Sequence, residues 1–262
     1  MTSDALINLK GLFPFRLATT SYILPEAIIP NLRFLGPLFD EIEIVLFDSR
    51  HPESLPTEEE IAQIAVLNRE LGIACNVHLP IDVYLGSPDT KERLDACDTI
   101  LQYYERTLPL GPSAYILHLE RDGGETGIDE LADWRRRLRL SLEELLNRGV
   151  KPEKVSVENL DYPFSWVDIL VEEYGMTYCL DVGHFLKQDV NLSTIFNRYG
   201  DRTAMIHLHG IDGRDHQAVT AIPDPDWLAV TETLRRYRGG LSLEVFSVEA
   251  LRDSLTRMAE LV

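Results

Sequence analysis

Strand-like and helix-like segments alternate along the chain, and this alternation constrains the fold more than any other feature. Short apolar runs rich in β-branched and aromatic residues predict eight strands, at residues 15–20, 41–47, 73–78, 114–119, 154–158, 177–181, 204–209 and 241–245. A segment with helical periodicity follows each of them, near residues 26–38, 57–71, 89–107, 129–148, 163–174, 191–199, 226–237 and 248–260. Strands that alternate with helices form a parallel sheet, and eight such units are the number that closes a barrel.

A doubly wound open sheet is the alternative architecture. That fold prefers a glycine-rich phosphate-binding loop after its first strand, whereas the first strand here continues as ATTSYILPE. No linker rich in proline, glycine or serine interrupts the series. We therefore predict an α/β protein that consists of a single (β/α)8 barrel domain over residues 1–262.

The bulk composition argues against several kinds of partner. The formal net charge is −18, which disfavours nucleic acid, because phosphates are bound by Lys and Arg. The one basic stretch, WRRRLR at 134–139, lies within a helix pattern. The N-terminus lacks a leader-like pattern, no apolar run reaches transmembrane length, and Cys75, Cys97 and Cys179 are dispersed as in a reducing compartment. We expect a cytoplasmic protein that acts on a small molecule, away from membranes, with an oligomeric state that composition leaves open.

Six of the seven histidines fall at or just beyond the C-terminal end of a predicted strand. In a (β/α)8 barrel these ends meet at one face, where catalytic groups gather. A lone buried histidine is more often a hydrogen-bonded core residue, and Asp181 alone could simply cap the following helix. That explanation would have to hold at six strand ends at once. Imidazoles and carboxylates are the ligands of zinc, manganese and iron, so the pattern predicts a metal centre.

This order of residues resembles the xylose-isomerase-like barrel superfamily, which includes endonuclease IV-type phosphodiesterases and sugar isomerases and epimerases. The endonuclease IV pattern implies one to three Mn²⁺ or Zn²⁺ ions. The resemblance assigns His78 and His118 to one ion and makes Glu158 the bridge to a second. It completes the second ion with Asp181, His207 and Glu244, and it gives His184 and His216 to a third. Arg214 stands where that family has an aspartate, which leaves Asp215, Asp212 or no residue to complete the third site.

A narrower resemblance is to the cobamide-remodelling phosphodiesterases of this superfamily. It is carried by FRLATTSYILPEAIIPNLRFLGPLFDEIEIVLFDS, NVHLPIDVYLGS and VSVENL. It implies hydrolysis of the nucleotide loop of an adenosylated cobamide to cobinamide phosphate and an α-riboside. The catalytic residues would be Glu158, Asp181, Glu244 and Arg214, the last as a phosphate ligand because its fork matches phosphate oxygens. A surface role for Arg214 is equally open.

Aromatic residues on the predicted rim loops are candidates for substrate contacts. We expect a flat ring such as a corrinoid to pack against Tyr22, Tyr84, Tyr162 and Phe185, with Phe164 as a further candidate, although ordinary rim packing explains each of them too. The acidic loop RDGGETG at 121–127 is either a lid or a plain surface loop.

The main alternative function is a metal-dependent sugar isomerase or epimerase. In that reaction Glu158 and Glu244 would flank one metal and move protons beside a carbonyl. Aldose isomerases of the superfamily also need a lysine near the strand-five carboxylate, and VENLDYPF has none, which weakens the isomerase but not an epimerase. An abasic-site endonuclease is disfavoured by the acidic balance. A non-catalytic binding barrel is disfavoured by the near-complete set of ligands.

Overall fold

Eight parallel strands close into a barrel in chain order, as the alternation predicts. The computed structural model describes residues 6–121 and 127–262. Each strand pairs with the next, and β1 pairs with β8 to close the ring. The strands are β1 Arg16–Thr20, β2 Glu41–Val45, β3 Ala74–His78, β4 Tyr115–Leu117, β5 Val155–Glu158, β6 Thr177–Asp181, β7 Thr203–Leu208 and β8 Gly240–Leu243.

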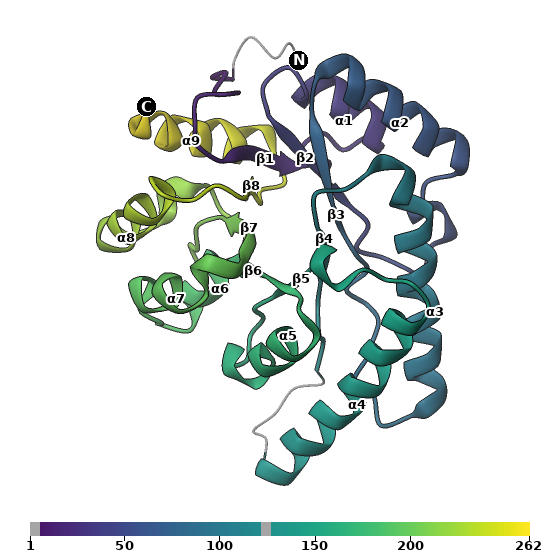
Figure 1. The fold of residues 1–262 in the computed structure, drawn as a ribbon. Helices are drawn as coiled ribbons and strands as arrows, with labels where there is room; N and C mark the ends of the chain where they lie inside the picture. The colour runs from purple at the N-terminus through teal and green to yellow at the C-terminus, as the bar shows by residue number, and fades with distance from the viewer. Residues whose placement is uncertain (1–5, 122–126) are drawn as a thin grey trace.

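Helices surround the strands on the outside of the barrel (Figure 1). They are α1 Ile28–Leu35, α2 Glu58–Leu71, α3 Thr90–Thr107, α4 Ile128–Asn147, α5 Asp168–Tyr174, α6 Val182–Lys187, α7 Leu192–Tyr199, α8 Asp224–Leu234 and α9 Val248–Met258. The prediction of a (β/α)8 barrel is confirmed. The sequence did not predict α6, a helix of six residues that follows β6 without a loop.

The start of α2 shows how the sequence fixes a helix boundary. The amide of Thr57 donates to Glu60 Oε2 at 2.8 Å, and the amide of Glu60 donates to Thr57 Oγ1 at 3.2 Å. This reciprocal capping box satisfies amides that would otherwise have no partner in the first turn. At the other end Gly72 adopts φ 60°, a left-handed conformation that suits glycine and turns the chain into β3.

The two sides of the strands bury different kinds of side chain. Outward residues such as Leu17, Val77 and Leu180 belong to the large core between strands and helices. Inside the barrel, Cys179 and Met205 are part of a small separate apolar cluster. Because side chains alternate along a strand, the next inward residues toward the carboxyl ends are polar. They are Asp181 on β6 and His207 on β7, so on these two strands the polar residues at the mouth of the barrel follow apolar ones deeper inside.

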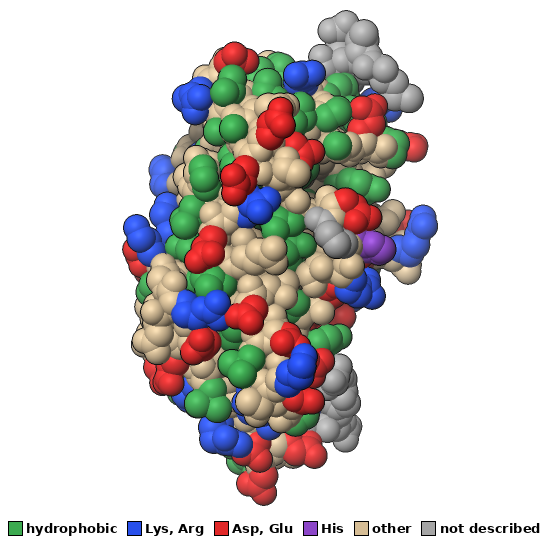
Figure 2. Space-filling view, turned by 90° about the vertical axis from the view of Figure 1, so that its right-hand side faces the viewer, with side chains coloured by type: hydrophobic (Ala, Val, Ile, Leu, Met, Phe, Trp, Pro, Cys, Tyr) green, Lys and Arg blue, Asp and Glu red, His purple; other side chains and the backbone are tan. Residues whose placement is uncertain are grey.

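Basic side chains do not form a separate stripe on the face of the molecule that Figure 2 shows. Lysines and arginines are mixed with acidic side chains over the face shown in Figure 2. In the basic stretch on α4, Arg135 donates to the carbonyl of Trp166, Arg137 donates to that of Gly86, and Arg139 pairs with Glu173. These guanidinium groups hold α4 to its neighbours. Among the described helices, none has the length and apolar character needed to cross a lipid bilayer.

One buried side chain organises the loop between β1 and α1. Asn31 is fully buried, and its Oδ1 accepts from the amides of Ile23 and Leu24 at 3.0 and 2.8 Å. Its Nδ2 donates to the carbonyls of Leu24, Glu26 and Ala27 at 3.1–3.2 Å. The loop at this corner of the barrel mouth therefore depends on one amide group.

We predict that Asn31→Ala lowers the free energy of unfolding by about 3 kcal/mol, because several buried backbone groups lose their partner. Urea denaturation followed by circular dichroism measures the change. The matched control is Asn197→Ala on the exposed side of α7, for which we expect a change within about 0.5 kcal/mol. Equal stability of the two variants would show that the loop does not need the amide.

Candidate functional site

Glu158, at the carboxyl end of β5, lies at the centre of a cluster of histidines. Its Oε2 lies 3.1 Å from His118 Nε2, 3.2 Å from His78 Nε2 and 3.4 Å from His207 Nδ1. The glutamate is 1% exposed. Its oxygen is therefore shared by three imidazoles that come from β3, β7 and the segment after β4.

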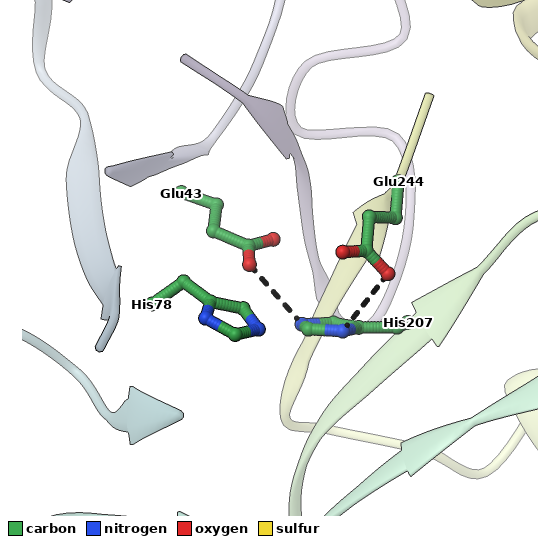
Figure 3. A group of neighbouring side chains, drawn as sticks. All are labelled: Glu43, His78, His207 and Glu244. Carbon is green, nitrogen blue, oxygen red and sulfur yellow. Dashed lines mark ion pairs between the residues drawn. The ribbon is translucent and has the colours of Figure 1, made fainter. Parts of the chain in front are cut away.

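His207 lies between two further carboxylates (Figure 3). Its Nε2 is 3.3 Å from Glu43 Oε1, and its Nδ1 is 3.2 Å from Glu244 Oε2. His78 lies beside this row, with its ring centroid 5.8 Å from that of His207. The ligand atoms of these four buried residues are close enough together to hold a metal ion.

Asp181 has two tasks, one for each carboxylate oxygen. The amide of His184 donates to Oδ1 at 2.7 Å, so Asp181 caps α6. Oδ2 lies 3.1 Å from His209 Nε2. The capping role therefore does not exclude a role in the site, and Asp181, His184 and His209 form a second group with the spacing of metal ligands.

Glycine at position 183 allows α6 to pass close to His209. A Cβ at this position would lie 1.9 Å from Cε1 of the His209 ring. His209 is fully buried, and its Nδ1 lies 3.2 Å from both the carbonyl oxygen of Gly210 and the amide nitrogen of His216. His216 itself has φ 53°, which is unusual for a residue other than glycine. The chain thus takes a tight path to place three histidines together at the ends of β6 and β7.

The charges in the cluster depend on one another. Burial disfavours the ionised form of Glu158. The nearby His207 and His118 outweigh this effect of burial and hold the pKa of Glu158 well below the usual value. Burial opposes protonation of His118, yet Glu158 and Glu120 raise its pKa to about 10. In the same way Asp181 overcomes burial and raises the pKa of His209 to about 9. Protons on His118 and His209 therefore favour the ionised forms of Glu158 and Asp181 in the protein without metal.

Several buried polar atoms of the site lack a hydrogen-bond partner. Among the described residues these include both carboxylate oxygens of Glu43, both ring nitrogens of His207, and Glu244 Oε2. Burying such atoms without a partner costs about 1–3 kcal/mol each. A divalent cation would satisfy them, and imidazole with carboxylate is the donor set that zinc and manganese accept. The residues present therefore fit a metal ion, whose identity the donor atoms leave open.

Most of the predicted site residues lie in this one cluster. His78, His118, Glu158, His207 and Glu244 are in mutual contact. His184 and His216 join it at the edge, with His216 Nδ1 3.8 Å from Glu244 Oε2 and His184 Nδ1 4.0 Å from Glu158 Oε1. The Asp181 carboxylate bonds to His184 and His209, and among the described residues it forms no hydrogen bond or ion pair with His207, its partner on the neighbouring strand, or with Glu244. The resemblance grouped it with those two.

Asp215, a candidate for the third site, lies 3.8 Å from His184 Nε2 and 3.5 Å from His209 Nδ1, and it also pairs with Lys187 at 2.9 Å. Two predicted residues lie elsewhere than the sequence suggested. The side chain of Arg214 is exposed and has no hydrogen bond or ion pair with the cluster among the described residues. Phe185 is buried in the core against Phe164, because α6 begins directly after β6 and turns this side chain away from the rim. We therefore leave Phe185 out of the proposed substrate contacts.

The three predicted tyrosines lie nearer to the mouth. Tyr22 is 55% exposed beside an apolar cavity, and Tyr84 is half-buried. Tyr162 donates to the carbonyl of Leu119 at 2.9 Å and lines a second cavity of about 400 Å³ with His118 and His184. The loop at 121–127, considered as a lid, lies outside the described residues except for its two ends.

Glu43 and His209 belong to the site, but the sequence pattern did not assign them as ligands. Glu43 sits in EIEIV, where inward and outward residues alternate, so the period of a strand places it inside the barrel. His209 lies two residues after His207 and therefore has the same orientation. Alternation was the available signal, but it does not distinguish a ligand from a residue that positions one.

Comparisons with known proteins identify the fold. A family described as xylose isomerase-like TIM barrel matches residues 33–261. A D-tagatose 3-epimerase-like protein superposes with a TM-score of 0.74 at 17% identity, over 94% of this chain and 97% of that one. The 3-keto-D-glucoside 4-epimerase from E. coli gives 0.72 at 18%, over 94% and 99%. D-psicose 3-epimerase from Clostridium cellulolyticum H10 gives 0.73 at 14%, over 94% and 98%. No curated protein matches the sequence.

These comparisons contradict the predicted reaction. The three solved structures are named for sugar epimerisation, an isomerase reaction, and not for hydrolysis of a phosphodiester. The prediction of a cobamide phosphodiesterase is therefore wrong, and neither that subgroup nor a corrinoid substrate finds support. The prediction failed because phosphodiesterases and epimerases of this fold share their ligand residues, as the resemblance itself implied. At 14–18% identity the likeness establishes the fold alone.

We predict that Gly183→Ala weakens Mn²⁺ binding about 10- to 100-fold, because the new methyl group displaces His209 and the Asp181 carboxylate that it contacts. Isothermal titration measures the affinity. Gly200→Ala is the matched control, since Gly200 has φ −57° and a Cβ there meets nothing within 4 Å. Wild-type affinity in Gly183→Ala would remove His209 and Asp181 from the metal centre.

We also predict that the apparent affinity for Mn²⁺ rises as the pH increases from about 6 to 9. His118 and His209 bind protons in the metal-free protein, with pKa values of about 10 and about 9, and a cation must displace those protons. Each displaced proton contributes a factor of up to about ten per pH unit. Titrations in two buffers of different ionisation enthalpy count the protons released. An affinity that stays flat over this range would contradict the assignment.

Proposed function

Because the chain belongs to the xylose isomerase-like TIM barrel family, we propose that it is a metal-dependent sugar epimerase. The observation that carries this proposal is a pair of buried carboxylates that converge on one nitrogen of His207. Glu158 Oε2 and Glu244 Oε2 lie 3.4 and 3.2 Å from the same nitrogen, His207 Nδ1. Epimerisation removes a proton from one face of a carbon and returns a proton to the other face. Such a reaction needs two proton-transferring groups at one small site, and two carboxylates can fill that role.

Glu158, His207 and Glu244 would hold a Mn²⁺ or Zn²⁺ ion, with Asp181 beside them. When bound, the ion would polarise the substrate carbonyl and stabilise the negative charge that develops on its oxygen. Burial of these residues at the barrel mouth excludes bulk water, which strengthens each electrostatic contact with the substrate.

The two glutamates would act on opposite faces of the carbon next to the carbonyl. One carboxylate takes the proton from this carbon, and the other returns a proton to the opposite face, which inverts the configuration. Glu158 is suited to the accepting step because His207 and His118 keep it ionised. Its low proton affinity also lets it release the proton again. His118 lies 3.1 Å away, where its ring would hold the carboxylate in place.

An epimerase fits better than an aldose–ketose isomerase. The residues after Glu158, NLDYPF, contain no lysine that could stand near the carbonyl. Lys187 reaches this side of the barrel, but Asp215 and Asp161 engage its ammonium at 2.9 and 3.0 Å. The hydroxyl groups of a sugar would find partners in the cavity beside His118 and His184, where Glu120 and Asp161 also lie. We treat residues 1–262 as one catalytic domain that acts on a small molecule.

The direct test is deuterium exchange. The Mn²⁺-loaded protein is incubated in D₂O with D-tagatose, D-fructose or L-ribulose, and NMR follows the label at the carbon beside the carbonyl together with the new epimer. We expect exchange with at least one ketose. Glu158→Gln and Glu244→Gln should each slow it by about 10²- to 10⁴-fold, because the amide cannot accept the proton.

Glu249→Gln, an exposed glutamate in the first turn of α9, is the control and should keep the wild-type rate. Metal content is measured for each variant, so that loss of the ion is distinguished from loss of the base. Absence of exchange from folded, metal-loaded protein with all three ketoses would count against an epimerase of free ketoses. Exchange that survives both glutamine substitutions would reject the assigned bases.

A further inference from the structure

A large apolar cavity lies near the metal cluster. The proposed reaction of a free sugar does not use it. It has a volume of about 670 Å³ and lies between the loop after β1, the end of β2 and the segment after β8. Its wall includes Ile28, Ile29, Val45, Phe47, Ile64 and Phe246. This volume is within the range of about 300–1,000 Å³ that is typical of sites for drug-sized ligands.

Two aromatic side chains connect this cavity to the histidines. The ring of Phe47 meets that of His78 edge-on, with centroids 4.6 Å apart. The ring of Phe246 meets that of His216 in the same manner at 5.1 Å. Phe47 and Phe246 also contact each other, with centroids 6.2 Å apart. The cavity therefore lies one layer of aromatic side chains away from His78 and His216.

The polar groups around the cavity are poorly placed to bind a sugar. Ser21 Oγ accepts the amide of Val45 at 3.0 Å, and Glu60 is engaged by Thr57 in the cap of α2. Asp48 is held by Arg50 at 3.2 Å. A buried hydroxyl group without a partner costs free energy, so the apolar wall disfavours the sugar ring and favours an aromatic or aliphatic group.

The charge at the mouth narrows the choice of ligand. Four carboxylates border the cavity, those of Glu26, Asp48, Glu53 and Glu60. They would repel a phosphate or a carboxylate on the ligand. The second cavity, beside His118 and His184, lies at other members of the same cluster and has the charged groups of Glu120 and Asp161 in its wall. The two cavities thus offer separate places for the two halves of a ligand that is polar at one end and apolar at the other.

We infer that the substrate is a sugar conjugate that carries an uncharged, aromatic-sized apolar group, which binds in the cavity next to Phe47 and Phe246. This inference rests on the proposed function, because it takes the sugar half to lie at the metal cluster. A free ketose would occupy only the sugar half of the site and would leave this cavity empty.

The test compares phenyl β-D-glucoside with methyl β-D-glucoside as binding probes. Neither has a ketone, so both bind without turning over. Isothermal titration of the Mn²⁺-loaded protein should give an affinity about tenfold or more higher for the phenyl compound, because the ring buries apolar surface. Ile29→Gln places an amide in the apolar wall, and Ala27→Trp fills the cavity from an exposed position. Each should bring the ratio of the two affinities close to one.

Leu228→Gln is the matched control, because Leu228 is 61% exposed on α8 and does not border the cavity. It should keep the wild-type ratio. Equal affinity of the wild type for the two glucosides would overturn the inference while leaving the epimerase intact. A preference for the phenyl compound that survives both cavity variants would overturn it as well. If neither glucoside binds, this inference fails, and the ketose exchange, measured separately, decides whether the proposed epimerase stands.

Discussion

The structure depends on holding several charges together in the mouth of a closed barrel, away from water. One oxygen of Glu158 faces three imidazoles, and Glu43 and Glu244 lie on either side of one of them. Isolated carboxylates at this depth would lose their hydration without compensation. His207 and His118 supply that compensation for Glu158 in the metal-free protein, and a cation can take the place of their protons. The same contacts therefore stabilise the empty site and prepare it for metal.

The junction of β6 and α6 shows how the fold satisfies this demand with few residues. Asp181 ends the strand and caps the helix, and its second oxygen lies against His209. A longer loop would separate the cap from the ligand, whereas here one carboxylate fixes the backbone and the site together. This arrangement requires glycine at position 183, since no side chain fits between α6 and the ring of His209. Local structure and site chemistry are thus coupled at a single turn.

The sequence was sufficient to predict the barrel and most of the cluster, for identifiable reasons. Alternating strand and helix patterns give a parallel sheet, and histidines at successive strand ends must then converge. The helix α6 was missed because six residues are too few for a periodic signal. Phe185 was assigned to the rim for the same reason, since without α6 its segment resembles a loop. Glu43 and His209 were not assigned as ligands because alternation shows which side of a strand they face, but not what they contact there.

The reaction was the part that ligand residues could not decide. Imidazoles and carboxylates around a divalent cation activate water in one enzyme and polarise a carbonyl in another, so the metal centre alone is compatible with both. What separates the reactions is what surrounds the cluster. Arg214, the residue expected to bind phosphate, is exposed and has no hydrogen bond or ion pair with the cluster among the described residues, and the neighbouring cavity is apolar with an acidic border. A phosphodiester would meet repulsion there, whereas an uncharged ligand would not. The residues around the metal ligands therefore indicate the kind of substrate, which the ligands alone do not. The sequence pattern does not describe these surrounding residues.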